Sequence, residues 1–152
     1  MIKDILEKIA LHQHRLKCAL QEMQEWDSME QNLFEDFDRI KTVDTFIYRF
    51  IKLQDMMGEK LFKIFLDEIG EYRDDMSLLD VLDKLEKFKI IDDAHRWMSY
   101  RKLRNQLTHE YPDNEEEVLE GIGIAMESYE HIERIIENII AYCEDKRLHT
   151  ER

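Results

Sequence analysis

The chain has few residues that interrupt helices and few that crosslink, since its 152 residues include four glycines, one proline and two cysteines. The scarcity of glycine and proline favours helices, as does the abundance of Leu, Ile, Glu, Lys and Met, which lose little rotamer freedom in a helix. Cys18 and Cys143 stand near opposite ends of the chain and are too few for a disulfide framework. We expect both to be buried, as small apolar residues in a reducing cytosol.

Long apolar runs are also missing. No window approaches the roughly 18 apolar residues that a membrane-spanning helix needs. The N-terminal stretch MIKDILEKIALHQHRLK is charged throughout and lacks the apolar core of a secretion signal. We therefore expect a cytoplasmic protein with no membrane partner.

Positive charge is in deficit, with 22 basic against 35 acidic residues and a formal net charge of −13. Such a molecule as a whole repels nucleic acid and anionic membranes at long range. One segment is an exception, because between Lys87 and His109 six basic residues stand against two acidic ones, a local net charge of +4. A polyanion could dock on this segment, with an affinity that falls as salt rises.

Apolar residues recur at helical spacing along most of the chain. This periodicity predicts helices over about 2–26, 43–70, 77–88, 92–111 and 114–145. Short connections between helices favour antiparallel neighbours. We therefore predict an all-α fold, an up-and-down four-helix bundle with an additional short helix, in one domain over residues 1–152 whose last residues, 146–152, form a frayed tail.

Local signals support the helix boundaries. Gly70 stands where a C-terminal glycine belongs, and Ser77 with Asp80 three residues later resembles a capping box. Pro112 disfavours helical geometry at the residue before it, so the fourth helix should end there. Asn114 and the three glutamates after it suit the start of the last helix.

The stretch RNQLTHEYP, residues 104–112, places charged and polar groups unusually. On a wheel of 100° per residue Arg104 flanks the apolar arc of its helix, where a guanidinium is costly unless it pairs with an acid or meets an anion. Arg104 is therefore a candidate for phosphate recognition. His109 falls about 140° away, so either the helix unwinds before His109 or two chains build one site.

These residues resemble a known signature. Arg104-Asn105-x3-His109-x-Tyr111 is similar to the Arg-x4-His-x-Tyr motif of HEPN-domain proteins, specifically the HepT-like partners of minimal nucleotidyltransferases in toxin–antitoxin pairs. The polar residue that follows the arginine belongs to the same pattern. The number of helices, the length and the place of the motif near the end of the penultimate helix also agree.

A second stretch agrees with the first. DTFIYRFIKLQD, residues 44–55, is similar to the second-helix pattern of nucleotidyltransferase substrate-binding proteins of that superfamily, with Arg49-Phe50 and an acidic residue at Asp55. The resemblance therefore covers essentially the whole chain.

The resemblance implies a metal-independent endoribonuclease whose catalytic Arg104 and His109 meet at the interface of a homodimer. His109 would remove a proton from a 2′-hydroxyl or protonate the leaving oxygen, while Arg104 stabilises charge on the phosphorus oxygens. Asn105 would orient the phosphate or the partner's histidine. Neither a metal nor a cofactor is expected, and the candidates for further RNA contacts are the basic residues of the same segment, Arg96, Arg101 and Lys102.

The resemblance also implies partners. An RNA, such as a transfer RNA, would be the substrate, and a minimal nucleotidyltransferase would act as antitoxin by transferring AMP to Tyr111. The added phosphate and nucleotide would occupy the anion site and exclude RNA.

Two other functions stay open. The chain could be a non-catalytic nucleotide- or substrate-binding subunit of a nucleotidyltransferase, which suits the acidic surface, or a scaffold in which the motif is accidental. Arg104 could then simply pair with an acid, His109 could sit at the negative end of the helix dipole, and the Tyr111 ring could pack in the core.

Other histidines have simpler interpretations. His12 and His14 lie two apart on a helix and cannot share a ligand, so we expect both to be exposed. The sequence Asp92-Asp93-x-His95 suggests a metal, but helix capping explains its acids.

Overall fold

The structure is a computed structural model that describes residues 1–27, 31–111 and 113–150, apart from the side chains of 31, 32 and 147–150. The described residues form six α-helices, one 3-10 turn and one π-helical turn. In chain order these are α1 (Ile2–Gln24), η1 (Gln31–Glu35), α2 (Phe37–Met56), η2 (Met57–Leu61), α3 (Phe62–Glu68), α4 (Leu78–Lys87), α5 (Ala94–Glu110) and α6 (Glu115–Thr150). The prediction of an all-α helical bundle is confirmed.

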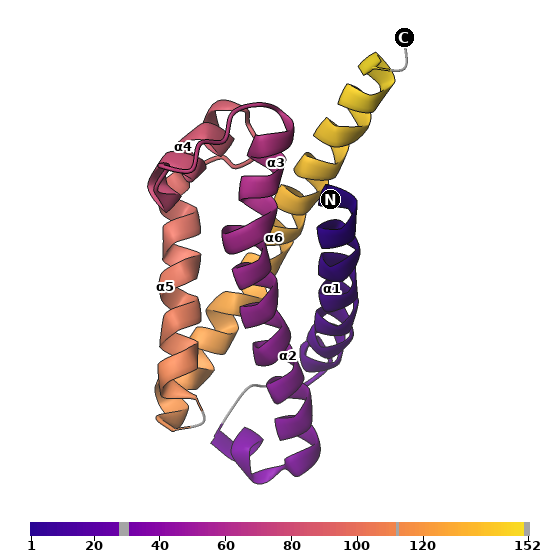
Figure 1. Cartoon of the computed structure of the whole chain (residues 1–152). Coiled ribbons are helices and arrows are strands. Elements are labelled where there is room, and N and C mark those ends of the chain that lie inside the picture. The colour runs from indigo at the N-terminus through magenta and orange to yellow at the C-terminus, as the bar shows by residue number, and fades with distance from the viewer. Residues whose placement is uncertain (28–30, 112, 151–152) are drawn as a thin grey trace.

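Successive long helices run in opposite directions, as Figure 1 shows. α1 runs down, α2, η2 and α3 return as one continuous rod, α5 runs down again, and α6 returns obliquely behind that rod. The short α4 lies at the end of the molecule where α3 passes to α5. α2 lies against both α1 and α5, which makes it the central helix of this side of the bundle.

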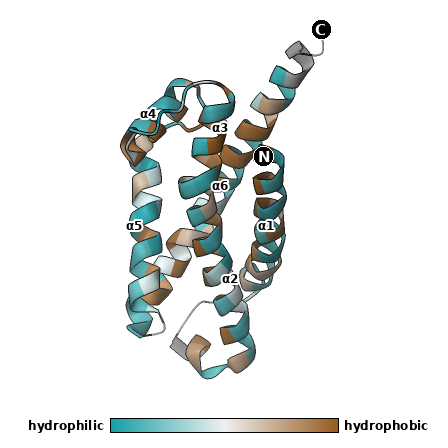
Figure 2. Ribbon diagram, in the orientation of Figure 1, coloured by the Kyte–Doolittle hydropathy of each residue, from teal (hydrophilic) through white to brown (hydrophobic). Residues whose placement is uncertain are grey.

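The core forms where the apolar stripes of these helices meet. Its largest fully buried side chains are mostly on α2, η2 and α3, including Phe46, Phe50, Phe62 and Phe65. Hydrophobic and hydrophilic residues alternate along each long helix in Figure 2, as expected when only one side of a helix is buried. The periodicity seen in the sequence therefore corresponds to real burial.

Several predicted helix ends are confirmed. Gly70 has a φ of +76° just after α3, a conformation that glycine adopts without strain. Ser77 and Asp80 form a full capping box, in which the Ser77 hydroxyl accepts from the Asp80 N–H and the Asp80 carboxylate from the Ser77 N–H. The Asp93 carboxylate caps α5 by accepting from the His95 N–H at 2.8 Å. α5 ends at Glu110, and its C-cap residue Tyr111 is extended, as the following proline requires.

α2 begins earlier than its apolar periodicity predicts. The helix starts at Phe37, after Asp36, whose carboxylate accepts from the N–H groups of Asp38 and Arg39. The first turn is polar, and its Phe37 is 68% exposed, so it carries no apolar stripe. The cap, and not the hydrophobic pattern, marks this end.

The last helix also differs from the prediction. α6 continues to Thr150, beyond the expected end at about Asp145, and residues 151 and 152 of the expected tail lie outside the described residues. At its start Asn114 has a φ of +50°, and its side-chain amide donates to the Glu110 carboxylate.

Within the described part of the chain, no helix combines the length and the apolar character that crossing a membrane requires. The expectation that both cysteines are buried is wrong, since Cys18 is exposed and Cys143 is only partly buried. Cys18 lies on the polar side of α1, where its small side chain has no core position to fill.

Candidate functional site

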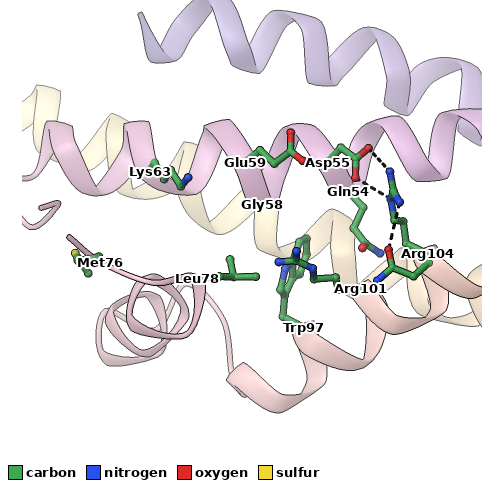
Figure 3. Close-up of a pocket in the computed structure, with 11 residues that line it drawn as sticks. Gln54, Asp55, Gly58, Glu59, Lys63, Met76, Leu78, Trp97, Arg101 and Arg104 are labelled. Atoms are coloured by element: carbon green, nitrogen blue, oxygen red, sulfur yellow. Dashed lines mark hydrogen bonds and ion pairs between the residues drawn. The ribbon is translucent and has the colours of Figure 1, made fainter. Parts of the chain in front are cut away.

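Arg104 crosses the gap between α5 and α2 to meet Asp55. Its Nε donates to Oδ1 of Asp55 at 2.9 Å and its Nη2 to Oδ2 at 2.8 Å, so the two planar groups pair at two points. Figure 3 shows both side chains pointing toward one another from their two helices. These hydrogen bonds raise the pKa of the Arg104 guanidinium above its ordinary value. The position of Arg104 on the flank of the apolar arc is thus stabilised by an acid.

The same guanidinium retains capacity for a second anion. Its Nη1 donates to Oδ1 of Asn105 at 3.2 Å, so three of its five N–H donors bond to described residues. The remaining two donors have no partner among the described residues, and the side chain keeps 26% of its surface exposed. Arg104 can therefore hold Asp55 and still donate to a phosphate oxygen.

A cleft of about 300 Å³ opens beside this pair. Its lining includes the apolar Trp97, Leu78 and Met76, the cations Lys63 and Arg101, and the acids Asp55 and Glu59 (Figure 3). Trp97 is held in place by Phe62, whose ring centre lies 4.8 Å away in an edge-to-face arrangement. A cleft that has both cations and apolar side chains in its lining suits a group with a phosphate and an apolar part.

The wall of the cleft on the α2 side contains an irregular turn. Asp55 precedes the π-helical turn η2, which includes the cleft residues Gly58 and Glu59. Single π-helical turns inside α-helices are frequent at functional sites. The buried Gln54 fixes the neighbouring turn, because its side-chain amide donates to the Tyr100 carbonyl of α5 at 2.8 Å. Neither the π turn nor the contact of Gln54 is marked in the hydrophobic pattern of the sequence.

His109 does not join Arg104 within one chain. α5 stays helical through Glu110, so the possibility that the helix unwinds before His109 is wrong. His109 is exposed in the last turn, about 140° around the helix from Arg104. Of the two arrangements expected from the sequence, only a site built by two chains can bring these residues together.

Tyr111 occupies the C-cap of α5. Its backbone N–H donates to the Leu107 carbonyl at 3.1 Å, and its ring is half-buried against the hydrophobic core. The interpretation of Tyr111 as a packing residue is therefore correct for part of its surface. The other part remains exposed to solvent.

The three candidates for RNA contacts differ in their surroundings. Arg96 is already paired with Asp92, Nη1 to Oδ2 at 3.3 Å. Arg101 lines the cleft, and Lys102 is exposed, with no ion pair to any described residue. Since Arg104 is also paired, the free positive charge of the 87–109 segment is smaller than its sequence suggests.

A hydrogen-bonded chain that the sequence did not predict joins α5 to α6. The Tyr100 hydroxyl lies 2.8 Å from Nδ1 of His131, and Nε2 of His131 lies 3.0 Å from Oδ1 of Asp92. Partial burial of Asp92 opposes its ionisation, but the adjacent His131 outweighs that effect and holds the pKa of the Asp92 carboxyl below its usual range. The acids near His95 thus serve structure: Asp93 caps a helix and Asp92 binds His131 and Arg96.

His12 is also placed differently from the prediction. The expectation that it is exposed is wrong, because it is half-buried and its Nδ1 accepts from Nη1 of Arg49 at 3.0 Å. Burial and the neighbouring Arg49 lower the pKa of His12 below its ordinary value. His14 is exposed, as expected. The spacing of two histidines on one helix could not reveal a partner on another helix.

Metal ligation finds no support in the described residues, which contain no cluster of three or more His, Cys, Asp or Glu side chains that could hold an ion. No protein-family model, curated protein or solved structure matches this chain. Residues 44–55 and 104–111, which are far apart in the sequence, meet in space at the Asp55–Arg104 pair.

Proposed function

We propose that the protein is a metal-independent endoribonuclease that acts as a homodimer, with Arg104 and His109 contributed to each site by different chains. The observation that carries the proposal is the placement of Arg104, which is fixed by Asp55 at the mouth of a cleft and retains two N–H donors. A guanidinium held in this way matches the oxygens of a phosphodiester.

The chemistry needs only groups that the RNA and these side chains supply. The 2′-oxygen attacks phosphorus, the bond from phosphorus to the 5′-oxygen breaks, and a 2′,3′-cyclic phosphate and a 5′-hydroxyl result. His109 takes the 2′-hydroxyl proton or gives a proton to the leaving oxygen. Arg104 stabilises the charge that develops on the phosphorus oxygens. Asn105, bonded to Arg104 at 3.2 Å, orients the guanidinium.

The exposed face of α5 suits a pair of antiparallel helices. Met98, Lys102, Asn105 and His109 follow one another at intervals of four, three and four residues, which places them on one exposed stripe. A two-fold axis that passes level with residues 106–107 puts His109 of one chain at the level of Arg104 of the other, because both are equally far from the axis. The two side chains meet only if the contact runs along the Asn105 edge of this stripe, which is the edge beside Arg104.

Control by a minimal nucleotidyltransferase forms part of this proposal. AMP transferred to the partly exposed Tyr111, near the end of the same helix, would add a phosphate and a nucleotide beside the site. Such an adduct would exclude RNA by charge and by bulk. An AMP-modified protein that cleaves RNA at the unmodified rate would contradict this step.

Incubation with bulk transfer RNA in excess EDTA tests the proposal. We expect the parent to cleave and to leave cyclic phosphate ends, and Arg104→Ala and His109→Ala to lose activity by at least about 100-fold. His95→Ala is the matched control, since His95 is another exposed histidine of α5 and should leave the rate unchanged. Absence of cleavage by a parent that carries no adduct on Tyr111 would overturn the proposal.

Mixing the two inactive variants tests the composite site. In a mixed dimer, Arg104 of the His109→Ala chain meets His109 of the Arg104→Ala chain, so one intact site forms. We expect the mixture to recover about a quarter of the parental activity after subunit exchange. A site contained in one chain predicts no recovery.

A separate observation favours a second function. The cleft exists in a single chain and combines Trp97 with Arg101 and Arg104, which suits one nucleotide without any second chain. The protein would then be the nucleotide- or substrate-binding subunit of a nucleotidyltransferase. Titration with ATP and AMP distinguishes the two functions, because this alternative predicts binding that Arg104→Ala abolishes and His109→Ala leaves unchanged.

A further inference from the structure

A second positively charged surface lies on the other side of α2. In a chain with 35 acidic residues, segments 8–21 of α1 and 45–54 of α2 contain none. The two helices run antiparallel and in contact, so these acid-free segments lie side by side. The charge of these two segments, five basic residues and no acid, is opposite in sign to the net charge of the chain.

A shallow groove of about 580 Å³ follows this contact, and we call it the α1/α2 groove. Three cations, Arg15, Lys41 and Arg49, and one acid, Glu22, are among the residues that line it. Neither Arg15 nor Lys41 forms an ion pair with any described residue. Residues 41 and 49 are two turns apart, about 12 Å at a rise of 1.5 Å per residue, so the groove can meet more than one phosphate.

Arg49 is held in position without losing its charge to an acid. Its Nη1 donates to Nδ1 of His12 at 3.0 Å, a neutral acceptor that leaves the guanidinium positive. No described residue accepts a hydrogen bond from the other N–H donors of Arg49, so they stay available for a ligand. An arginine positioned by a neutral histidine therefore keeps its full charge for an anion.

An exposed aromatic ring stands next to these cations. Tyr48 is 52% exposed, with the Arg49 guanidinium 5.1 Å and the Lys52 ammonium 5.7 Å from its ring centre. Lys52 is one turn from Asp55, so the stripe of α2 that begins at the groove continues to the Arg104 pair. An aromatic face among cations is the arrangement on which bases of single-stranded nucleic acid stack.

We propose that the α1/α2 groove and Tyr48 bind a single-stranded segment of RNA and lead it across α2 toward the cleft at Arg104. Phosphates lie along Arg15, Arg49 and Lys52, and one base stacks on Tyr48. That the strand is RNA rests on the proposed ribonuclease function. The exposed ring favours a nucleic acid over an acidic peptide, since a peptide carboxylate gains nothing from a stacking face.

Binding to an RNA that cannot be cleaved tests this inference apart from catalysis. A fluorescently labelled, fully 2′-O-methylated 12-nucleotide RNA is titrated with the protein at several salt concentrations, and anisotropy gives the Kd. We expect the double variant Arg15→Gln, Lys52→Gln to weaken binding by about tenfold or more and to reduce the salt slope by about 1.4, the value for two lost contacts to a single strand. The double variant Lys3→Gln, Arg134→Gln removes the same charge from exposed positions outside the groove and outside the 87–109 segment, and should change both quantities little.

Tyr48 separates stacking from charge. Tyr48→Ala should weaken binding at least about fivefold with no change in salt slope, while Tyr48→Phe retains the ring and should bind like the parent. Since Tyr48 is exposed, neither change should unfold the chain, and circular dichroism checks this.

The outcomes for the two proposals can be told apart. RNA binding that groove variants lose, in a protein that never cleaves, supports the groove and overturns the ribonuclease function. Groove and Tyr48 variants that bind like the parent overturn the groove even if the parent cleaves. A parent that fails to bind the RNA but binds poly-glutamate overturns it too, and identifies the surface as a site for acidic protein.

Discussion

Asp55 and Arg104 are 49 positions apart in the sequence, and their side chains pair at two points between α2 and α5. Both are partly exposed, at 30% and 26% of their side-chain surface, so solvent screens the attraction. The pair therefore contributes little to the stability of the bundle. Its main effect is geometric, because it fixes the plane and direction of the guanidinium.

Asp55→Asn tests this positioning role. The amide keeps the size of the side chain but donates where the carboxylate accepted, so Arg104 loses its fixed orientation. We expect RNA cleavage to slow by about tenfold or more, while binding of uncleavable RNA stays the same or tightens because a negative charge is gone. Glu59→Gln, which removes another carboxylate from the same cleft, should leave cleavage nearly unchanged. Weaker RNA binding in Asp55→Asn would contradict the positioning role.

Two glycines of α6 provide a matched test of the α5–α6 contact. A Cβ on Gly121 would lie 3.0 Å from Cδ2 of Leu107, whereas a Cβ on Gly123 would have no neighbour within 4 Å. Both alanine substitutions gain about 0.5–1 kcal/mol from helix propensity. We expect urea denaturation to show that gain in Gly123→Ala, and a smaller gain or a loss in Gly121→Ala. Equal gains would show that Leu107 moves aside without strain.

The fold could be predicted from sequence because its causes are local or periodic. The apolar stripes fix the number and order of the long helices, and the capping box at Ser77 and Asp80 fixes the start of α4. Where a boundary depends on something other than apolar spacing, the prediction fails. The polar first turn of α2 and the π-helical turn η2 leave no mark in the hydrophobic pattern.

The candidate site was only half predictable for a related reason. The helix wheel places Arg104 on the flank of the apolar arc and so predicts a partner, and the wheel also separates His109 from Arg104 correctly. The wheel cannot say which acid of another helix reaches Arg104. Contacts such as Asp55 with Arg104, Gln54 with Tyr100 and His12 with Arg49 depend on how two helices are placed side by side.

Two buried tyrosines differ in their hydrogen bonding and predict different effects of the same change. The Tyr100 hydroxyl bonds to His131 at 2.8 Å, whereas the Tyr129 hydroxyl is buried near Gln13 and Glu133 without a hydrogen bond of ordinary geometry to any described residue. Burial raises the pKa of both hydroxyls. Removing a hydroxyl that is bonded costs about 1 kcal/mol, and removing one that is unpaired is neutral or stabilising.

We therefore expect Tyr100→Phe to lower the free energy of unfolding by about 1 kcal/mol, and Tyr129→Phe to leave it unchanged or raise it. Urea denaturation of both variants beside the parent measures the difference. Equal effects would show that the hydrogen bond from Tyr100 to His131 contributes nothing, or that Tyr129 is bonded in solution.

His12 makes the contact between α1 and α2 depend on pH. Arg49 always donates, so Nδ1 of His12 must accept and the ring must be neutral in the folded protein. Burial, Arg49, Lys52 and Arg15 all lower the pKa of His12. At a pH between that lowered pKa and the ordinary value of about 6.5, the unfolded chain binds more protons than the folded chain. The stability that neutral His12 contributes is therefore fully present above about pH 6.5 and is lost as the pH falls toward the lowered pKa.

We expect the urea midpoint of the parent to be lower at pH 5.5 than at pH 7.5. The fall should be smaller in His12→Asn, because the amide oxygen of the asparagine accepts from Arg49 without titrating. His95→Asn is the control, since His95 is exposed and should leave the parental loss unchanged. The difference between the two variants therefore isolates His12. If His12→Asn loses as much stability as the parent, the bond from Arg49 does not hold the histidine neutral.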